Sequence, residues 1–309
     1  MTDTATFERH RAHLLNIAYR MLGEMAAAED VVQEAWLRWR RADGEDIRDP
    51  RAWLSAATVR LSLDALRKIR ARRESYVGPW LPEPLLPDDT RTFAADAPAA
   101  RAELASDLSL ALLHVLERLS PEERAALILH DAFDCDYAEI AAMLDKNEPA
   151  CRKLVSRARE RVRADRPRFT TSREAHRDLL MRFAQASSSS DPQEMMSLLA
   201  PDAIAYTDGG GRVAAALNPI YGADKIARFI QGLGRKFYAN AVLELSVTEI
   251  NGQPALVIRA DDEMLGLLAI ETDGERITTL YGLRNPDKLT RVMRSLNLPS
   301  TGSFPSAEQ

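Results

Sequence analysis

The chain has 309 residues, of which 46% are hydrophobic and 28% are charged, and its formal net charge is −5. At about 100 to 200 residues per domain this length indicates two or three domains, and the composition excludes a disordered or low-complexity chain. The start of the sequence lacks the features of a signal peptide, and no apolar run is long enough to cross a bilayer. A cytoplasmic protein with no membrane contact is therefore expected.

Cysteine usage excludes two kinds of site. The two cysteines, Cys135 and Cys151, have no CxxC spacing, which argues against both a disulfide framework and a zinc site. We expect buried or half-buried thiols, and neither a metal nor a cofactor.

Hydrophobic spacing divides the chain into three parts. Residues 7 to about 76 have apolar positions at helical spacing, and helical spacing resumes from Leu104, where Ser120-Pro121 marks a later helix start. Between them a run rich in proline and then in acidic residues and alanine predicts an extended linker. From Thr171 the pattern is mixed: helices are predicted over residues 174–187 and 222–235 and strands over 242–250, 255–260 and 277–283, with turns at Asn251-Gly252 and Asp273-Gly274. The expected fold class is multidomain: two all-α domains followed by an α+β domain with a curved antiparallel sheet.

A helix predicted over residues 28–39 carries a polar face. The candidate surface residues are Asp30, Gln33, Glu34 and Trp36. At helical spacing Val31, Ala35 and Leu37 can turn inward. Alone, such a face is typical of a solvated helix surface, so its neighbours decide between that alternative and a docking surface.

A helix that begins at Asp49-Pro50 combines a tryptophan with a series of cations. Its candidate site residues are Trp53, Arg60, Asp64, Arg67, Lys68 and Arg70. Aromatic faces accept unstacked bases while Arg and Lys bind phosphates, so this combination suits single-stranded DNA. Two alternatives stay open: Trp53 can be a core residue, and the cations can be an ordinary solvated helix end.

Residues 137–163 have the pattern of a helix-turn-helix. A short amphipathic helix over 137–144 is followed by a turn at 145–148, and Pro149 starts a second helix. The N-terminal residues of that helix would face the bases of the major groove: Glu148, Arg152, Lys153 and Ser156. Arg157, Arg159, Arg161 and Arg163 would be available to phosphates. A helical hairpin with a basic face is the alternative.

Together these features resemble bacterial RNA polymerase sigma factors of the extracytoplasmic-function type over about residues 7–168. The similarity to region 2 rests on Tyr19-Arg20-Met21-Leu22-Gly23 and on the 28–39 run. The similarity to region 4 rests on Leu119 to Arg124 and on Ser156-Arg157-Ala158-Arg159. The resemblance implies that the 28–39 surface binds core RNA polymerase. It also implies that the Trp53 to Arg70 residues read the −10 promoter element and that the 148–157 residues read the −35 element. Arg60 departs from the Asn that many members use to read the flipped base.

The rest of the chain resembles the SigJ-like subgroup of that family, which adds a SnoaL-like domain. The similarity rests on Tyr76 to Pro84 in the linker and on two further motifs. The resemblance implies that these two motifs are regulatory and that they contact the sigma half or polymerase. They are Asp208, Gly209, Gly210 and Gly211, and Asn285, Pro286, Asp287, Lys288 and Leu289. The implied division is region 2 at 1–76, a linker at 77–103, region 4 at 104–168, the SnoaL-like domain at 172–295 and a flexible tail at 296–309.

SnoaL-like folds are similar to ketosteroid isomerase, which makes catalysis by the last domain an alternative. Candidate residues are Asp202, Tyr206, Asp208 and Tyr221, but no catalytic fingerprint is present, and we do not expect an enzyme. The expected partners are core polymerase, promoter DNA, an intramolecular contact between the last domain and the sigma domains, and an unknown small ligand in the cone pocket. The rival hypothesis is a helix-turn-helix regulator with a ligand-sensing or isomerase-like C-terminal domain.

Overall fold

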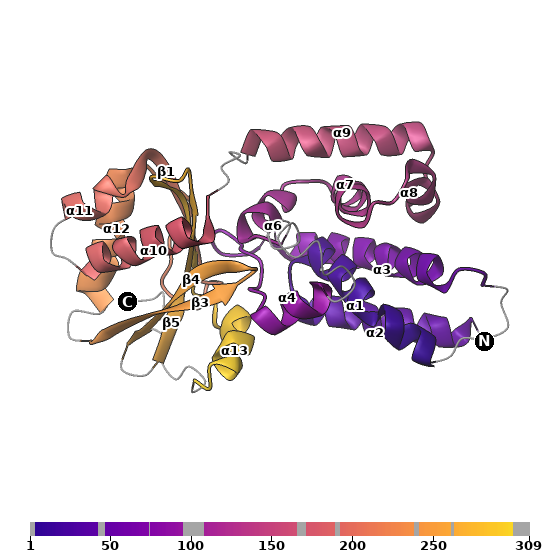
Figure 1. Ribbon diagram of the computed structural model, residues 1–309, viewed down its shortest axis with the longest axis horizontal. Coiled ribbons are helices and arrows are strands. Elements are labelled where there is room, and N and C mark those ends of the chain that lie inside the picture. The colour runs from indigo at the N-terminus through magenta and orange to yellow at the C-terminus, as the bar shows by residue number, and fades with distance from the viewer. Residues whose placement is uncertain are drawn as a thin grey trace. The chain divides into compact units, whose positions relative to one another are not determined.

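The computed structural model describes residues 4–42, 47–73, 75–94, 108–165, 171–188, 192–237, 241–260 and 263–298. The chain divides into two compact units (Figure 1). The helical unit comprises Met1–Glu74 and Asp88–Arg166, and the C-terminal unit comprises Ser75–Pro87 and Pro167–Gln309. In the described ranges no helix is both long and apolar enough to cross a membrane.

The first part of the helical unit is built from α1 (Thr4–Leu22), α2 (Met25–Arg41) and α3 (Pro50–Arg73), each of which contacts the other two. Leu14, Ile17 and Trp39 are among the apolar side chains of these helices that are almost completely buried. The carboxylate of Asp49 accepts a hydrogen bond from the backbone N–H of Ala52 at 3.1 Å. The predicted start of this helix at Asp49-Pro50 is confirmed, with Asp as its cap.

The second part consists of α4 (Pro87–Ala94), α6 (Leu110–Leu116), α7 (Pro121–Phe133), α8 (Tyr137–Leu144) and α9 (Glu148–Asp165). Ser120 with Glu123, and Asp136 with Glu139, form capping boxes that fix where α7 and α8 begin. Asp145 adopts a left-handed conformation at φ 55° and ends α8. Helix α4 lies within the stretch 77–103 that was expected to be an extended linker, and the unit division assigns it to the helical unit.

The C-terminal unit contains α10 (Arg173–Ser188), α11 (Pro192–Ser197), α12 (Ala223–Phe237), α13 (Pro286–Ser295) and one six-stranded sheet. The strands are β1 (Leu199–Asp208), β2 (Ile220–Tyr221), β3 (Leu243–Ile250), β4 (Gln253–Ala260), β5 (Glu263–Thr272) and β6 (Ile277–Leu283), in the order β2-β1-β6-β5-β4-β3. The β1–β6 pair is parallel and the other pairs are antiparallel. Because β1 and β6 run in the same direction, Asp208 and Leu283 end the two strands side by side.

Side chains of α10, α11 and α12 share the core of this unit with β1, β4, β5 and β6, as Phe183, Ile226 and Leu280 illustrate. The Asn251-Gly252 prediction is confirmed: both residues have positive φ, and Ile250 pairs with Gln253 across a two-residue turn. The second predicted turn, at Asp273-Gly274, lies in a longer connection between Thr272 and Ile277.

The two cysteines are free thiols in α9 and just before α8. Cys151 is buried and Cys135 is half-buried, as expected. Burial raises the pKa of Cys135 to about 11, which keeps its thiol protonated near neutral pH.

Candidate nucleic-acid interface and linker clamp

The N-terminal half of α9 has an exposed polar face opposite a buried apolar one. Its exposed residues are Glu148, Arg152, Lys153, Ser156 and Arg157. Cys151, Val155 and Ala158 are buried on the other face, which anchors the helix. Arg152 forms an ion pair with Glu148 at 2.9 Å and lies 4.6 Å from the centre of the Tyr137 ring. The structure therefore brings the five predicted −35 residues together on one face.

Two of the arginines predicted to be available to phosphates form ion pairs with α7. Arg159 binds Asp131 at 2.5 Å, and this hydrogen bond raises the pKa of Arg159. Arg161 binds Glu123 at 2.7 Å. Both pairs join α9 to α7, and Arg161, like Arg163, is exposed.

The cations of α3 fall into two groups. Arg60 donates from Nη2 to Ala142 O at 3.0 Å and from Nε to Met143 O at 3.3 Å, in the last turn of α8. Arg70 donates from Nη2 to Glu117 O at 3.1 Å and also to Leu119 O. Cations near helix ends satisfy carbonyls that have no partner within the helix. Two of the predicted −10 residues thus bind the part of the helical unit that carries the helix-turn-helix.

The other predicted −10 residues remain on the surface or beside it. Lys68 is exposed, and the exposed Arg67 and Asp64 form an ion pair at 3.1 Å. Trp53 is half-buried, with its ring centre 5.6 Å from that of Trp39. Its packing supports the alternative of a core contribution and leaves part of the ring accessible.

The predicted polymerase-docking face of α2 is mostly open. Asp30 and Gln33 are exposed, and Glu34 pairs with Arg38 at 3.4 Å. Trp36 is half-buried against Phe7, with ring centres 4.8 Å apart. The expectation that Leu37 turns inward is wrong, because its side chain is 41% exposed. Its spacing from Asp30 and Gln33, seven and four residues, could have placed it on the same face.

A buried arginine that the sequence did not single out joins the two parts of the helical unit. Arg124 in α7 is 1% exposed, donates from Nε to Arg20 O at 2.9 Å and pairs with Glu117. Burial lowers the pKa of Arg124 to about 9, so it still carries its charge at neutral pH. Neither helical spacing nor charge pattern distinguishes it from the surface arginines.

The two C-terminal motifs bind the linker. Asp208, at the end of β1, is fully buried and accepts hydrogen bonds from Tyr76 OH at 2.5 Å, from Leu81 N at 2.9 Å and from Gly210 N at 3.1 Å. Asn285 donates to the same Tyr76 oxygen at 2.9 Å and caps α13. We call Tyr76, Asp208, Asn285 and Lys288 the linker clamp.

Lys288 provides the positive charge of the clamp. Its Nζ lies 2.7 Å from Asp208 Oδ2 and 2.5 Å from Leu81 O, and its side chain is 8% exposed. The ammonium also lies 4.0 Å from the Trp80 ring centre and 5.2 Å from that of Tyr76, in the range of cation–π attraction. A buried ion pair is thus completed by the linker backbone and its aromatic rings.

Apolar and backbone contacts extend the docking along the linker. Leu81 and Leu85 are fully buried, and the backbone of Leu85 exchanges hydrogen bonds with Asn251 at 2.9 and 3.1 Å. Gly210 has φ +62°, and a Cβ there would lie 2.5 Å from Asn285 Nδ2. The glycine motif is therefore required both for its turn and for the close approach of the cap.

The residues weighed for catalysis do not come together. Asp202 is exposed, Tyr221 is 59% exposed, Tyr206 stacks on Tyr281 at 5.9 Å, and Asp208 belongs to the clamp. Over the described residues no group of three or more His, Cys, Asp or Glu side chains is arranged to hold a metal ion.

Comparison with known proteins gives two family matches and relatives along most of the chain. Residues 6–73 match Sigma-70 region 2 and residues 109–162 match Sigma-70, region 4. The ECF RNA polymerase sigma factor SigJ of Mycobacterium tuberculosis is 38% identical to this chain, and the match covers 93% of both chains. The probable ECF RNA polymerase sigma factor SigI of the same organism is 31% identical, and the match covers 95% of this chain and 97% of SigI. The crystal structure of M. tuberculosis SigJ matches with a TM-score of 0.69 at 36% identity, covering 93% of this chain and 98% of that one.

These matches agree with the order of elements described above. Sigma factors bind core RNA polymerase and promoter DNA, and the helix-turn-helix with its exposed polar face lies inside the region 4 match. The sigma factor interpretation is favoured over a regulator that recruits no polymerase, because the region 2 match and the relatives include the part of the chain that such a regulator would lack. The chain belongs to the extracytoplasmic-function family of RNA polymerase sigma factors.

Proposed function

We propose that this sigma factor uses three separate surfaces to start transcription and that its own C-terminal unit modulates that step. The face of α2 around Asp30, Gln33, Glu34 and Trp36 docks on core polymerase, with the exposed Leu37 adding apolar contact. A charged face sets orientation and partner choice, while apolar neighbours add affinity.

The exposed half of α9 is the proposed −35 reader. Arg152 and Lys153 are on its open face, where Arg or Lys can address guanine edges. Arg157 supplies a phosphate contact that does not depend on sequence. The −10 element is read along α3, and Arg60 and Arg70 must leave their carbonyl acceptors before they can bind DNA.

The −35 assignment is tested by binding of the full chain, loaded on core polymerase, to duplex promoter DNA at several salt concentrations. Lys153→Ala should weaken binding and reduce the slope of log K against log salt by about one, the value expected for one phosphate or base-edge cation. Arg228→Ala is the control, since Arg228 is an exposed arginine of α12. Equal salt slopes for Lys153→Ala and wild type would contradict the assignment.

The linker clamp is the observation that carries the proposal of self-regulation. A buried carboxylate, a buried lysine and a tyrosine hydroxyl bind the segment that leads from α3 to α4. A segment that served only as a spacer would need none of these contacts. The C-terminal unit therefore controls the path of the chain between the two promoter-reading regions.

Tyr76→Phe tests this role with a minimal change, because it removes one oxygen that binds both Asp208 and Asn285 and retains the ring. Promoter-dependent transcription with purified core polymerase should change in yield by at least about threefold, as expected for the loss of one or two buried hydrogen bonds. Tyr221→Phe, at an exposed tyrosine, is the matched control. Transcript yields that are the same for both variants and wild type would overturn the regulatory proposal.

A further inference from the structure

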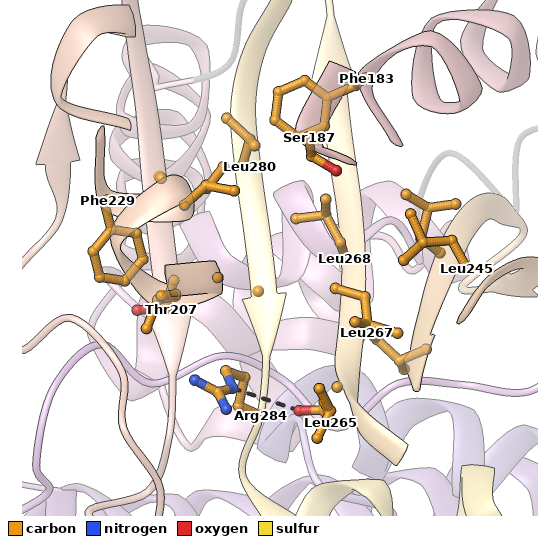
Figure 2. Close-up of a pocket in the computed structure, with 18 of the residues that line it drawn as sticks. Phe183, Ser187, Thr207, Phe229, Leu245, Leu265, Leu267, Leu268, Leu280 and Arg284 are labelled. Atoms are coloured by element: carbon orange, nitrogen blue, oxygen red, sulfur yellow. Dashed lines mark hydrogen bonds between the residues drawn. The ribbon is translucent and has the colours of Figure 1, made fainter. Parts of the chain in front are cut away.

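The C-terminal unit contains an apolar cavity between its helices and its sheet (Figure 2). The cavity has a volume of about 180 Å³. Phe183 of α10 and Phe229 of α12 line it together with Leu245, Leu268 and Leu280 from three different strands. Its walls therefore come from the same elements that form the core of the unit.

The polar groups in the wall are already bound to the protein. Ser187 Oγ donates to Ala184 O at 2.7 Å, and Thr207 Oγ1 accepts from Ala216 N at 2.8 Å. The guanidinium of Arg284, at one end of the cavity in Figure 2, donates to Leu265 O and Ala214 O. The described residues that line the cavity include no carboxylate, imidazole or thiol, and they include one phenol, that of Tyr206, whose ring stacks on Tyr281. The wall therefore offers mainly apolar contact.

We propose that this cavity is a binding site for a neutral, mainly apolar small molecule of about one aromatic or alicyclic ring. A dry cavity of about 150 Å³ lined by Leu, Ile and Phe binds benzene, and the cavity here is of similar size and lining. A cationic ligand would lose its hydration without gaining a partner, because the described lining includes the guanidinium of Arg284 and no carboxylate. The ligand class is therefore defined by shape and by the absence of a positive charge.

The end of the cavity at Arg284 adjoins the linker clamp along the chain. Thr207 precedes Asp208, and Arg284 precedes Asn285. The backbone N–H of Arg284 donates to Asp208 O at 2.8 Å. A ligand in the cavity thus contacts residues whose immediate neighbours hold the linker, and this regulatory consequence rests on the proposed function of the clamp.

Two helix glycines provide a matched pair of variants. Gly232 and Gly234 both lie in α12, and a Cβ added at either meets nothing within 4 Å, but only Gly234 lines the cavity. Replacing either by leucine favours the helix. Gly234→Leu should place its side chain in the cavity, whereas Gly232→Leu should leave the cavity open.

The test measures binding of toluene and of benzylammonium to the full chain by saturation-transfer NMR and by the shift in melting temperature. Toluene should bind the wild type and Gly232→Leu alike, and Gly234→Leu should bind at least about tenfold more weakly because its side chain occupies the ligand volume. Benzylammonium, which adds a positively charged group to the same ring, should not bind. Ser187→Leu, at another lining position, serves as the second blocking variant if Gly234→Leu has lost the circular dichroism of the wild type.

Three results would overturn the site: no toluene binding by the wild type, benzylammonium binding as tightly as toluene, or equal toluene binding by the blocking and control variants. These measurements need neither polymerase nor DNA, so their failure leaves the proposed promoter contacts unaffected. Hydrogen exchange of the Leu81 amide with and without toluene then measures whether the ligand affects the clamp. Equal exchange rates would refute the effect of the ligand on the clamp and would leave the binding site itself unaffected.

Discussion

Replacing Lys288 by methionine is expected to release the linker from the C-terminal unit. Methionine keeps an unbranched stem beside Trp80 but removes the ammonium that binds Asp208 at 2.7 Å and Leu81 O at 2.5 Å. The side chain of Asp208 is fully buried, so its carboxylate is left without the cation. Removing one partner of a buried ion pair costs about 3 to 5 kcal/mol. At about 1.4 kcal/mol per tenfold change, the docking equilibrium should fall at least about a hundredfold.

Hydrogen exchange of the full chain measures this change directly, because the Leu81 amide donates to the same carboxylate at 2.9 Å and is buried. Peptides that cover residues 76–86 should exchange at least about a hundredfold faster in Lys288→Met. Lys225→Met, at an exposed lysine of α12, should exchange like the wild type. If the Leu81 amide of Lys288→Met exchanged within about threefold of the wild-type rate, the buried pair would not hold the linker and the reasoning above would be refuted.

Three further changes test other parts of the fold. Arg70→Gln removes charged hydrogen bonds to two carbonyls, so it should lower the free energy of unfolding of the helical unit, measured in urea, by about 1.5 to 3 kcal/mol. Lys68→Gln, at an exposed lysine, should change that free energy by less than about 0.5 kcal/mol. Gly210→Ala should lower the melting temperature of the C-terminal unit, because Gly210 has a positive φ and the new Cβ would lie 2.5 Å from an amide nitrogen. Gly232→Ala should raise that melting temperature slightly. Equal effects of the two changes would contradict the structure. His176 is buried, its Nε2 has no hydrogen-bond partner, and burial lowers its pKa. The unfolded chain therefore takes up the proton first, so stability should be lost as pH falls below about 6.5, and melting curves of His176→Gln should show a smaller loss.

Much of the architecture could be predicted because local chemistry determines it. Ser120 and Asp136 begin helices with capping boxes that the helix itself completes, and Asn251-Gly252 allows the positive φ values of a tight hairpin. Two features depend on contacts that are distant in sequence. Helix α4 forms in a stretch that proline and acidic residues mark as linker, and the parallel pairing of β1 with β6 joins strands separated by about seventy residues of chain.

The site shows the same division between local and distant information. The open face of α9 follows from helical spacing alone, since Cys151, Val155 and Ala158 repeat on the opposite face. The partners of the arginines do not follow from helical spacing, because a guanidinium on a long stem reaches whichever acceptor the tertiary fold brings near. Arg60 and Lys68 have the same pattern in the sequence, but Arg60 binds carbonyls of α8 and Lys68 is exposed. The clamp was recognisable as a pair of motifs, and only the fold showed that both bind the linker.

The contacts that hold the chain differ in strength in a way that bears on how it is activated. Arg60 and Arg70 each bind carbonyls from part-buried or exposed positions, and charged hydrogen bonds of this kind contribute about 1.5 to 3 kcal/mol at most. A protein partner that binds with nanomolar affinity has about 12 kcal/mol available, which is enough to release both. The Lys288–Asp208 pair is buried on both sides, and releasing the linker from it costs more because the carboxylate would remain in the interior. If polymerase docks as proposed, separating either arginine of α3 from its carbonyl acceptors therefore costs less than releasing the linker from the C-terminal unit.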